Sequence, residues 1–167
     1  MALNLITPVS DVHRRDFAVD DSDLLDPTSA THLKQGEWVG MTSSGQVRAA
    51  TAMISGTNIA EGEGPFYQVF SQKGDYGAQA LGKITCIMSF GYEAETDMFE
   101  DATYTVGQLL TVTNGDTDGG ETGDTTRFVL TGVDAAADVV VGVVTMIPTA
   151  TASGLLRFQR LSPYHQD

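Results

Sequence analysis

Apolar and polar residues alternate over several short stretches of the chain, and this pattern predicts strands. The clearest hairpin lies in residues 36–48, where Val39 and Met41 alternate with smaller or polar neighbours. A period of two is typical of a half-buried strand. Residues 43–45 then supply a tight turn, with Gly45 able to take a positive φ. Residues 46–50 are expected to return as the second strand.

The same pattern occurs a second time. Residues 107–113 repeat residues 36–42, with Gly107 in the place of Gly36. The second copy is followed by a long loop of glycine and acidic residues at 114–124 instead of a tight turn, a change that a surface tolerates. We therefore expect a duplicated core whose inward-facing positions are Val39, Met41, Leu110 and Val112.

Four further stretches have the apolar pattern of strands: residues 65–70, 83–92, 139–147 and 154–161. Residues 83–92 would place Ile84, Cys86, Met88, Phe90 and Tyr92 on one face. The almost continuous apolar run at 139–147 is typical of a strand buried on both faces. The fold class predicted is all-β, a small β-barrel or sandwich of about eight strands.

The first 30 residues differ from the rest because they show little periodicity. We interpret residues 1–30 as an extended N-terminal arm with at most one short helical turn, and residues 31–167 as a single β-barrel domain. No Pro- or Ser-rich linker divides the chain further. The arm would become ordered on a neighbouring subunit and bury its apolar side chains there; the alternative is a frayed terminus.

The net charge of the chain narrows the classes of molecule that it can bind. Nine Lys and Arg residues stand against 22 Asp and Glu, which gives a net charge of −13. Such a surface repels phosphate backbones and anionic membranes, so we expect neither a nucleic acid nor a membrane as partner. No apolar window is long enough to span a bilayer, and the N-terminus lacks the basic region of a signal peptide.

Candidate chemistry is sparse. The histidines His13, His32 and His165 share no local motif with a carboxylate or with the single cysteine, Cys86. One cysteine permits no intramolecular disulfide, which fits a reducing cytoplasm, and a buried thiol is favoured over a reactive one. We predict no catalytic residues and no cofactor, and hence a protein that is not an enzyme.

Two acidic segments are candidate binding sites. Residues 93–101 are expected to be a solvated loop. The loop at 116–124 is the best calcium candidate, but Gly120 and Arg127 occupy the fifth and twelfth positions of an EF-hand alignment, where oxygen ligands are needed. A flexible loop is favoured there, and no metal site is predicted.

Trp38 is the only tryptophan. A place in the core is favoured for its side chain. The alternatives are an anchor in an interface with a partner, where aromatic residues dominate binding, and a platform for stacking a sugar.

Residues 36–39 together with 45–47 resemble the small β-barrel hairpin of the head decoration (cement) proteins of tailed bacteriophages. Residues 104–112, with 139–144 as a returning strand, are similar to the same hairpin. Residues 70–75 leading to 82–85, and residues 155–158, also resemble phage structural proteins. The resemblance covers roughly residues 31–161, and the acidic segment at 11–26 lies outside it.

The resemblance implies a virion structural protein, made in the host cytoplasm, that binds the outer face of a capsid and bridges neighbouring major capsid subunits. Such proteins act as symmetric homo-oligomers, and we expect a trimer in preference to a dimer. Several weak contacts on one oligomer engage a symmetric lattice together. The predicted partner interface comprises Leu3, Leu5, Ile6, Val9, Arg14, Arg15 and Trp38.

Two other functions stay open at this point. One is a glycan- or calcium-binding β-sandwich, suggested by Trp38, Tyr67, Tyr76 and the loop at 116–124. The other is a different part of a virion, such as a tail or baseplate barrel, which shares the same fold argument.

Overall fold

The computed structural model of the chain describes residues 3–26, 29, 32–42, 44–49, 54–55, 58–59, 67–71, 82–100, 102–115, 127–134, 139–147 and 154–165. Throughout these ranges the regular structure is β-strand, with two single turns of 3-10 helix, η1 (Val9–Asp11) and η2 (Ser22–Leu24). The predicted all-β fold is confirmed. Neither turn has the length and apolar character that a membrane crossing requires.

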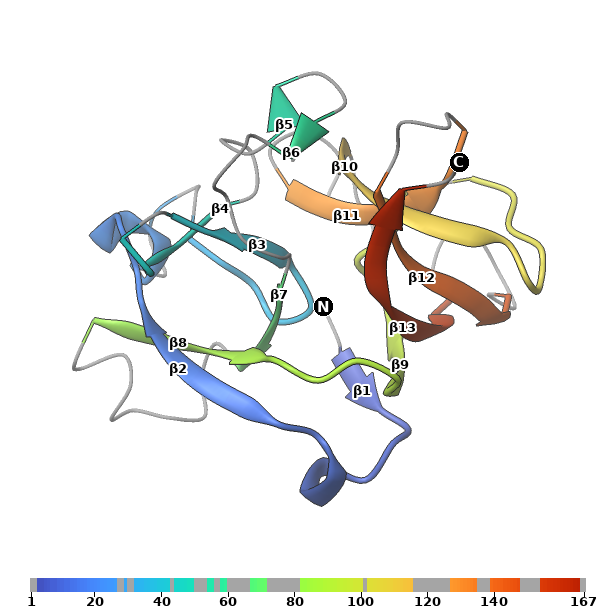
Figure 1. The fold of residues 1–167 in the computed structure, drawn as a ribbon, viewed down its shortest axis with the longest axis horizontal. Helices are drawn as coiled ribbons and strands as arrows, with labels where there is room; N and C mark the ends of the chain where they lie inside the picture. Colours follow the sequence, from blue (N-terminus) through green and yellow to red (C-terminus); the bar gives the residue numbers. More distant parts are fainter. Residues whose placement is uncertain are drawn as a thin grey trace.

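The strands form two main antiparallel sheets that resemble a sandwich and are not closed into barrels (Figure 1). The six-stranded sheet has the order β1 (Leu3–Leu5), β9 (Glu93–Thr96), β13 (Leu156–His165), β12 (Val139–Met146), β10 (Leu109–Gly115), β11 (Arg127–Gly132). The five-stranded sheet has the order β2 (Arg14–Ala18), β8 (Lys83–Ile87), β7 (Tyr67–Ser71), β3 (Trp38–Met41), β4 (Val47–Ala49). A small hairpin adds β5 (Ile54–Ser55) and β6 (Asn58–Ile59).

The two main sheets contain the same five-stranded unit. The N-terminal unit has the order β2-β8-β7-β3-β4, and the C-terminal unit has the order β9-β13-β12-β10-β11. Both units have an irregularity at the same place, between Val69 and Ser71 in β7 and between Val144 and Met146 in β12. The duplication predicted from two hairpins therefore extends to five strands in each half of the chain.

The duplicated glycines adopt the same conformation. Gly36 has φ 86° and Gly107 has φ 88°. The amide of Gly36 donates to Val69 O at 2.8 Å, and the amide of Gly107 donates to Val144 O, also at 2.8 Å. A positive φ is costly for residues with a Cβ, so the glycine at the start of each repeat is required by the backbone.

The residue after each glycine closes the same turn with its side chain. Glu37 Oε2 accepts from the Lys34 amide at 2.9 Å. Gln108 Oε1 accepts from the Thr105 amide at 3.0 Å. Glutamate and glutamine are interchangeable here because the turn uses only a side-chain carbonyl-type oxygen as acceptor.

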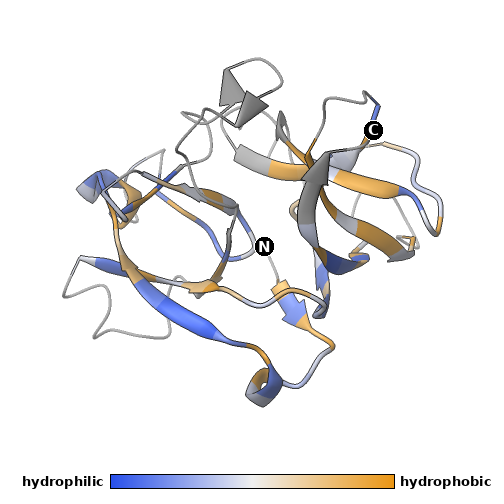
Figure 2. Ribbon diagram, viewed as in Figure 1, coloured by the Kyte–Doolittle hydropathy of each residue, from blue (hydrophilic) through white to orange (hydrophobic). Residues whose placement is uncertain are grey.

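Each unit has a hydrophobic core, and three residues of the N-terminal unit belong to the core of the C-terminal unit. The first core contains Phe17, Leu24, Leu33, Val39, Val47, Val69, Ile84 and Cys86. The second core, built on the six-stranded sheet, also takes in Val12, Trp38 and Ile87. These side chains, together with Phe70, which packs partly buried against the second core, belong to the interface between the units. Figure 2 shows apolar residues lining both units, whereas β2 at the lower left is strongly hydrophilic.

The matched inward positions behave as predicted. Val39 is buried in the first core, and Leu110 and Val112 are buried in the second. Met41 is partly buried against the first core. The hairpin between β3 and β4 pairs Val39 with Ala49 across its turn, which confirms the predicted strand–turn–strand segment.

Residues 93–101 were expected to be a solvated loop, and this expectation is wrong. They contain β9, in which Ala94 and Thr96 are 0% exposed while Glu93 and Glu95 face outward. The alternation was hidden because the inward positions carry small or polar side chains. The strand predicted at 83–92 is also shorter than expected, since β8 ends at Ile87.

The N-terminal segment contains two short helical turns, η1 and η2, so the expectation of at most one is wrong, and the segment does not project from the molecule. β1 pairs with β9 of the C-terminal unit, and β2 pairs with β8 of the N-terminal unit. Backbone hydrogen bonds to β9 and β8 thus hold a segment whose sequence shows no strand period.

The two equivalent glycines provide a matched test of the fold. A Cβ at Gly36 would lie 3.1 Å from Thr96 Oγ1 and 3.2 Å from Met98 Cγ, whereas a Cβ at Gly107 would meet nothing within 4 Å. Gly107→Ala is expected to lower the free energy of unfolding by about 1–2 kcal/mol, because only the positive φ is strained. Gly36→Ala should cost more in urea denaturation. An equal or smaller loss for Gly36→Ala would contradict this packing.

Candidate functional site

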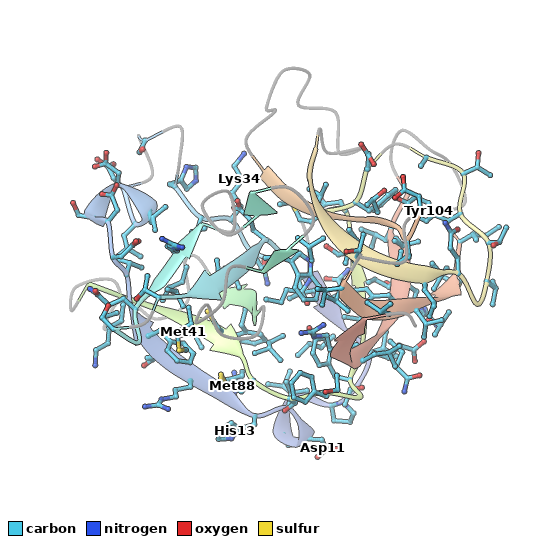
Figure 3. All side chains as sticks on the ribbon, turned by 45° about the horizontal axis from the view of Figure 1, so that its top comes forward. Asp11, His13, Lys34, Met41, Met88 and Tyr104 are labelled. Carbon is cyan, nitrogen blue, oxygen red and sulfur yellow. The ribbon has the colours of Figure 1, made fainter. Side chains whose placement is uncertain are left out.

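The N-terminal segment crosses from one unit to the other along one side of the molecule. After β1, the amides of Ile6 and Thr7 donate to Glu93 O at 2.9 and 3.1 Å, and Thr7 Oγ1 accepts from the Glu93 amide at 2.8 Å. The chain then passes through η1 and enters β2, where the His13 amide donates to Ser89 Oγ. These bonds hold the segment against residues 88–93. Figure 3 shows Asp11, His13 and Met88 along the lower edge of the molecule.

This side carries a set of exposed apolar side chains. Ile6 is 41% exposed, Val9 is 44% exposed and Phe90 is 47% exposed. We call these three residues the apolar surface. They come from the N-terminal segment and from the stretch at residues 88–93, which hydrogen-bond to each other through Ile6, Thr7 and His13.

Phe90 lies above a buried cation. The guanidinium carbon of Arg160 is 5.4 Å from the Phe90 ring centroid and 4.7 Å from the Trp38 ring centroid. Arg160 is only 2% exposed, and its Nη1 donates to Val141 O at 2.6 Å. Cation–π attraction is strengthened by desolvation. The exposed ring is therefore supported from below by a charge that is itself fixed by the fold.

Buried hydrogen bonds join the two units close to this cation. The Tyr92 hydroxyl donates to Gln68 Oε1 at 2.6 Å, and Gln68 Nε2 donates to Gly36 O at 3.0 Å. Burial raises the pKa of the Tyr92 hydroxyl, and the Arg160 charge opposes this rise more weakly. The hydroxyl therefore stays protonated and available as a donor.

β2 continues the same side of the molecule with charged residues. Arg14 lies over the Phe70 ring at 4.7 Å, and Arg15 lies over the Phe17 ring at 5.4 Å. Asp16 accepts from Thr85 Oγ1 at 2.7 Å. A shallow depression of about 570 Å³ runs beside the strand and is lined by residues 10–16 and Thr85. The surface is open and polar here.

The predicted interface residues divide into two groups. Ile6, Val9, Arg14 and Arg15 lie on the surface. Leu3 is 6% exposed and Trp38 is 0% exposed, and Leu5 packs partly buried against the second core. Leu3 and Trp38 do not reach a partner in this fold, because β1 covers the edge of β9 and because Trp38 fills the interface between the units. For Trp38 this is the favoured core placement.

Phe90 was missed as a surface residue. Its position in the alternation of residues 83–92 suggested that it faced the core with Ile84 and Cys86. The two latter residues are buried, but the strand ends before Phe90. Ser89-Phe90-Gly91, a polar residue and a glycine on either side of an aromatic one, was the available signal for a loop.

Reactive chemistry is limited in the part of the chain that the structure describes. Cys86 is fully buried, and burial, aided by the nearby Asp16 charge, raises the pKa of its thiol. The buried, unreactive thiol that the sequence favoured agrees with this placement. No group of three or more His, Cys, Asp or Glu residues converges within the described ranges. The calcium candidate at 116–124 lies outside them.

Tyr92→Phe tests the hydrogen bonds between the units. The change leaves the buried Gln68 Oε1 without its donor, and an unsatisfied buried acceptor costs about 1–3 kcal/mol. Urea denaturation followed by Trp38 fluorescence should show this loss. A free energy of unfolding equal to that of the original chain would mean that this bond does not stabilise the interface.

Comparison of the chain with protein-family models, with curated proteins and with solved structures finds no match. An assignment to a family therefore receives no support from these comparisons.

Proposed function

We propose that the chain is a non-enzymatic structural protein of a virion, which binds the outer surface of a phage capsid and stabilises it by bridging neighbouring major capsid subunits. The observation that carries the proposal is the apolar surface formed by Ile6, Val9 and Phe90. The resemblance of residues 31–161 to head decoration proteins supplies the identity of the partner.

Exposed large apolar side chains, an aromatic ring among them, are typical of a protein-binding site. Aromatic residues at the centre of an interface carry a large share of its binding energy. Here Phe90 stands on Arg160, which is buried and bonded to Val141 O. A ring held in place before binding loses little conformational entropy when a partner covers it.

The acidic character of the chain suits a protein that covers a shell from outside. A net charge of −13 disfavours contact with the nucleic acid inside a capsid. A protein that binds only the mature lattice shifts the equilibrium towards that lattice. Modest contacts are sufficient when many copies act together.

The structure bears differently on the two alternative functions, glycan or calcium binding and a place in the phage tail. Glycan binding through Trp38 is disfavoured because this ring is 0% exposed. The Tyr67 side chain, Tyr76 and the loop at 116–124 lie outside the described residues, so they add no argument for it. A protein of the tail or baseplate would use the same apolar surface. An image of the particle that locates the protein distinguishes this alternative from a location on the head.

The apolar surface can be tested by co-sedimentation with expanded empty capsids, assembled from the major capsid protein of the phage that encodes this chain. Phe90→Ser and Ile6→Ser should each weaken binding by about tenfold or more, since each removes apolar area from the centre of the contact. Unexpanded shells are expected to bind the original chain poorly.

The matched control is Val106→Ser. Val106 is 65% exposed and lies outside the apolar surface, in the turn before β10 of the C-terminal unit. Its replacement should leave binding unchanged. The proposal fails if Val106→Ser weakens binding as much as Phe90→Ser, or if the original chain has no affinity for either form of the shell.

A further inference from the structure

The outer edge of β2 presents backbone groups to solvent. His13 O accepts from the Met88 amide at 2.8 Å, and the Val19 amide donates to Gly82 O at 3.3 Å. Alternate residues of an antiparallel strand direct both backbone groups to the same neighbour. The odd-numbered residues of β2 therefore face β8, and the N–H and C=O groups of Arg14, Asp16 and Ala18 point away from it. These three side chains are exposed.

The equivalent edge in the C-terminal unit is covered. β9 corresponds to β2, and Glu95, opposite Arg157, corresponds to Asp16, opposite Thr85. β1 lies antiparallel against β9 and pairs Asn4 with Glu95. The duplicated unit thus takes an additional antiparallel strand at this edge in one copy, whereas the described residues provide none at the same edge of the other copy.

The opposite edge of each unit is also engaged. The Asp20 amide donates to Val47 O of β4 at 3.0 Å. The Glu100 amide donates to Leu130 O of β11 at 2.8 Å, which repeats the same arrangement. Of the outer edges in these two units, that of β2 is the one to which no described residue forms a backbone hydrogen bond. An uncovered edge is a template for pairing with another strand.

The charges of β2 are complementary to a second copy of β2. When two copies pair antiparallel around a two-fold axis through Arg15, Arg14 of each copy lies opposite Asp16 of the other. Opposite charges at directly facing positions stabilise a sheet. Shifting the axis to Arg14 or to Asp16 would place like charges at the axis and would lose both Arg14–Asp16 pairs. The sequence Arg14-Arg15-Asp16 therefore selects one register.

The central arginines do not oppose this register strongly. Each Arg15 guanidinium lies over the Phe17 ring of its own chain, at 5.4 Å. Because the two strands run in opposite directions, the two guanidinium groups are displaced to opposite sides of the axis. Arg14 and Asp16 lie on the other face of the strand, and an open depression of about 570 Å³ runs beside this part of β2.

We infer that β2 is a homodimer interface, at which two copies of the chain pair edge to edge and join their five-stranded sheets into one. The contact uses the backbone groups of Arg14, Asp16 and Ala18, together with two Arg14–Asp16 ion pairs. An edge that pairs with itself closes at two copies. The expected oligomer is therefore a dimer and not the trimer that the resemblance implies. The inference is independent of capsid binding, because it concerns the purified chain alone.

Sedimentation velocity over a wide range of protein concentration tests the interface. The original chain should form a dimer. Arg14→Glu and Asp16→Lys should each weaken the dimer by about tenfold or more, because each replaces two attractions by two repulsions. The double variant with both changes should restore it, since the opposite charges again face each other. Thr85→Val removes the hydrogen bond to Asp16 within the chain and should leave the dimer intact.

A cross-link tests the register. At a two-fold axis through Arg15 the two Cα atoms of this residue lie about 4.5–5.5 Å apart, within the range of a disulfide. Arg15→Cys should give a covalent dimer upon mild oxidation, whereas Ser44→Cys, an exposed position away from β2, should not. The native Cys86 is buried and should not interfere.

A monomer at every concentration would overturn the inference, and so would a dimer that Arg14→Glu and Asp16→Lys leave unchanged. Failure of the double variant to recover would show that the charges do not face each other. A dimer without lattice affinity would leave this interface standing and remove the proposed function. A strict monomer that binds the capsid lattice would remove this interface and leave the proposed function standing.

Discussion

The burial of Trp38 between two copies of one β unit is the contact on which the rest of the structure depends. Its ring packs against Phe158 at 6.3 Å and against the Arg160 guanidinium at 4.7 Å, so it joins β3 of one unit to β13 of the other. The equivalent residue in the second copy, Leu109, is only half-buried. The first copy thus has a large aromatic residue where the second copy has a half-buried aliphatic one. Burial of the apolar surface of this ring holds the units together.

This contact also positions the proposed binding surface. Arg160 lies between the buried Trp38 ring and the exposed Phe90 ring. The amide of Arg160 donates to Tyr92 O at 2.8 Å, and the Tyr92 hydroxyl reaches Gln68 in the N-terminal unit. Burying a charge is costly unless it is well bonded, so the arginine has little freedom to move. The interface between the units therefore holds the exposed Phe90 ring in place.

The two halves of the chain share one five-stranded unit and differ in how one strand edge is covered. Both units share strand order, the same irregularity and a glycine of positive φ at the same turn. They differ where a strand edge is covered: β1 lies on β9, and the corresponding edge of β2 carries charged residues. A repeated unit must satisfy its backbone in both copies, but the means of covering its edge is free to change.

The sequence by itself determined the strands, the hairpin, its echo around Gly107 and the inward positions Val39, Leu110 and Val112, because period-two alternation and turn glycines are local signals. It did not reveal β9, whose inward Ala94 and Thr96 lack apolar bulk, or β2, whose charged residues mask its strand. Phe90 was predicted to face inward because it is in phase with Ile84 and Cys86 in the local alternation. The sequence favoured a core position for Trp38, and the structure places its side chain there. Only the tertiary structure decided which strand edges are covered and that Phe90 is exposed, since these depend on pairings between residues far apart in the chain.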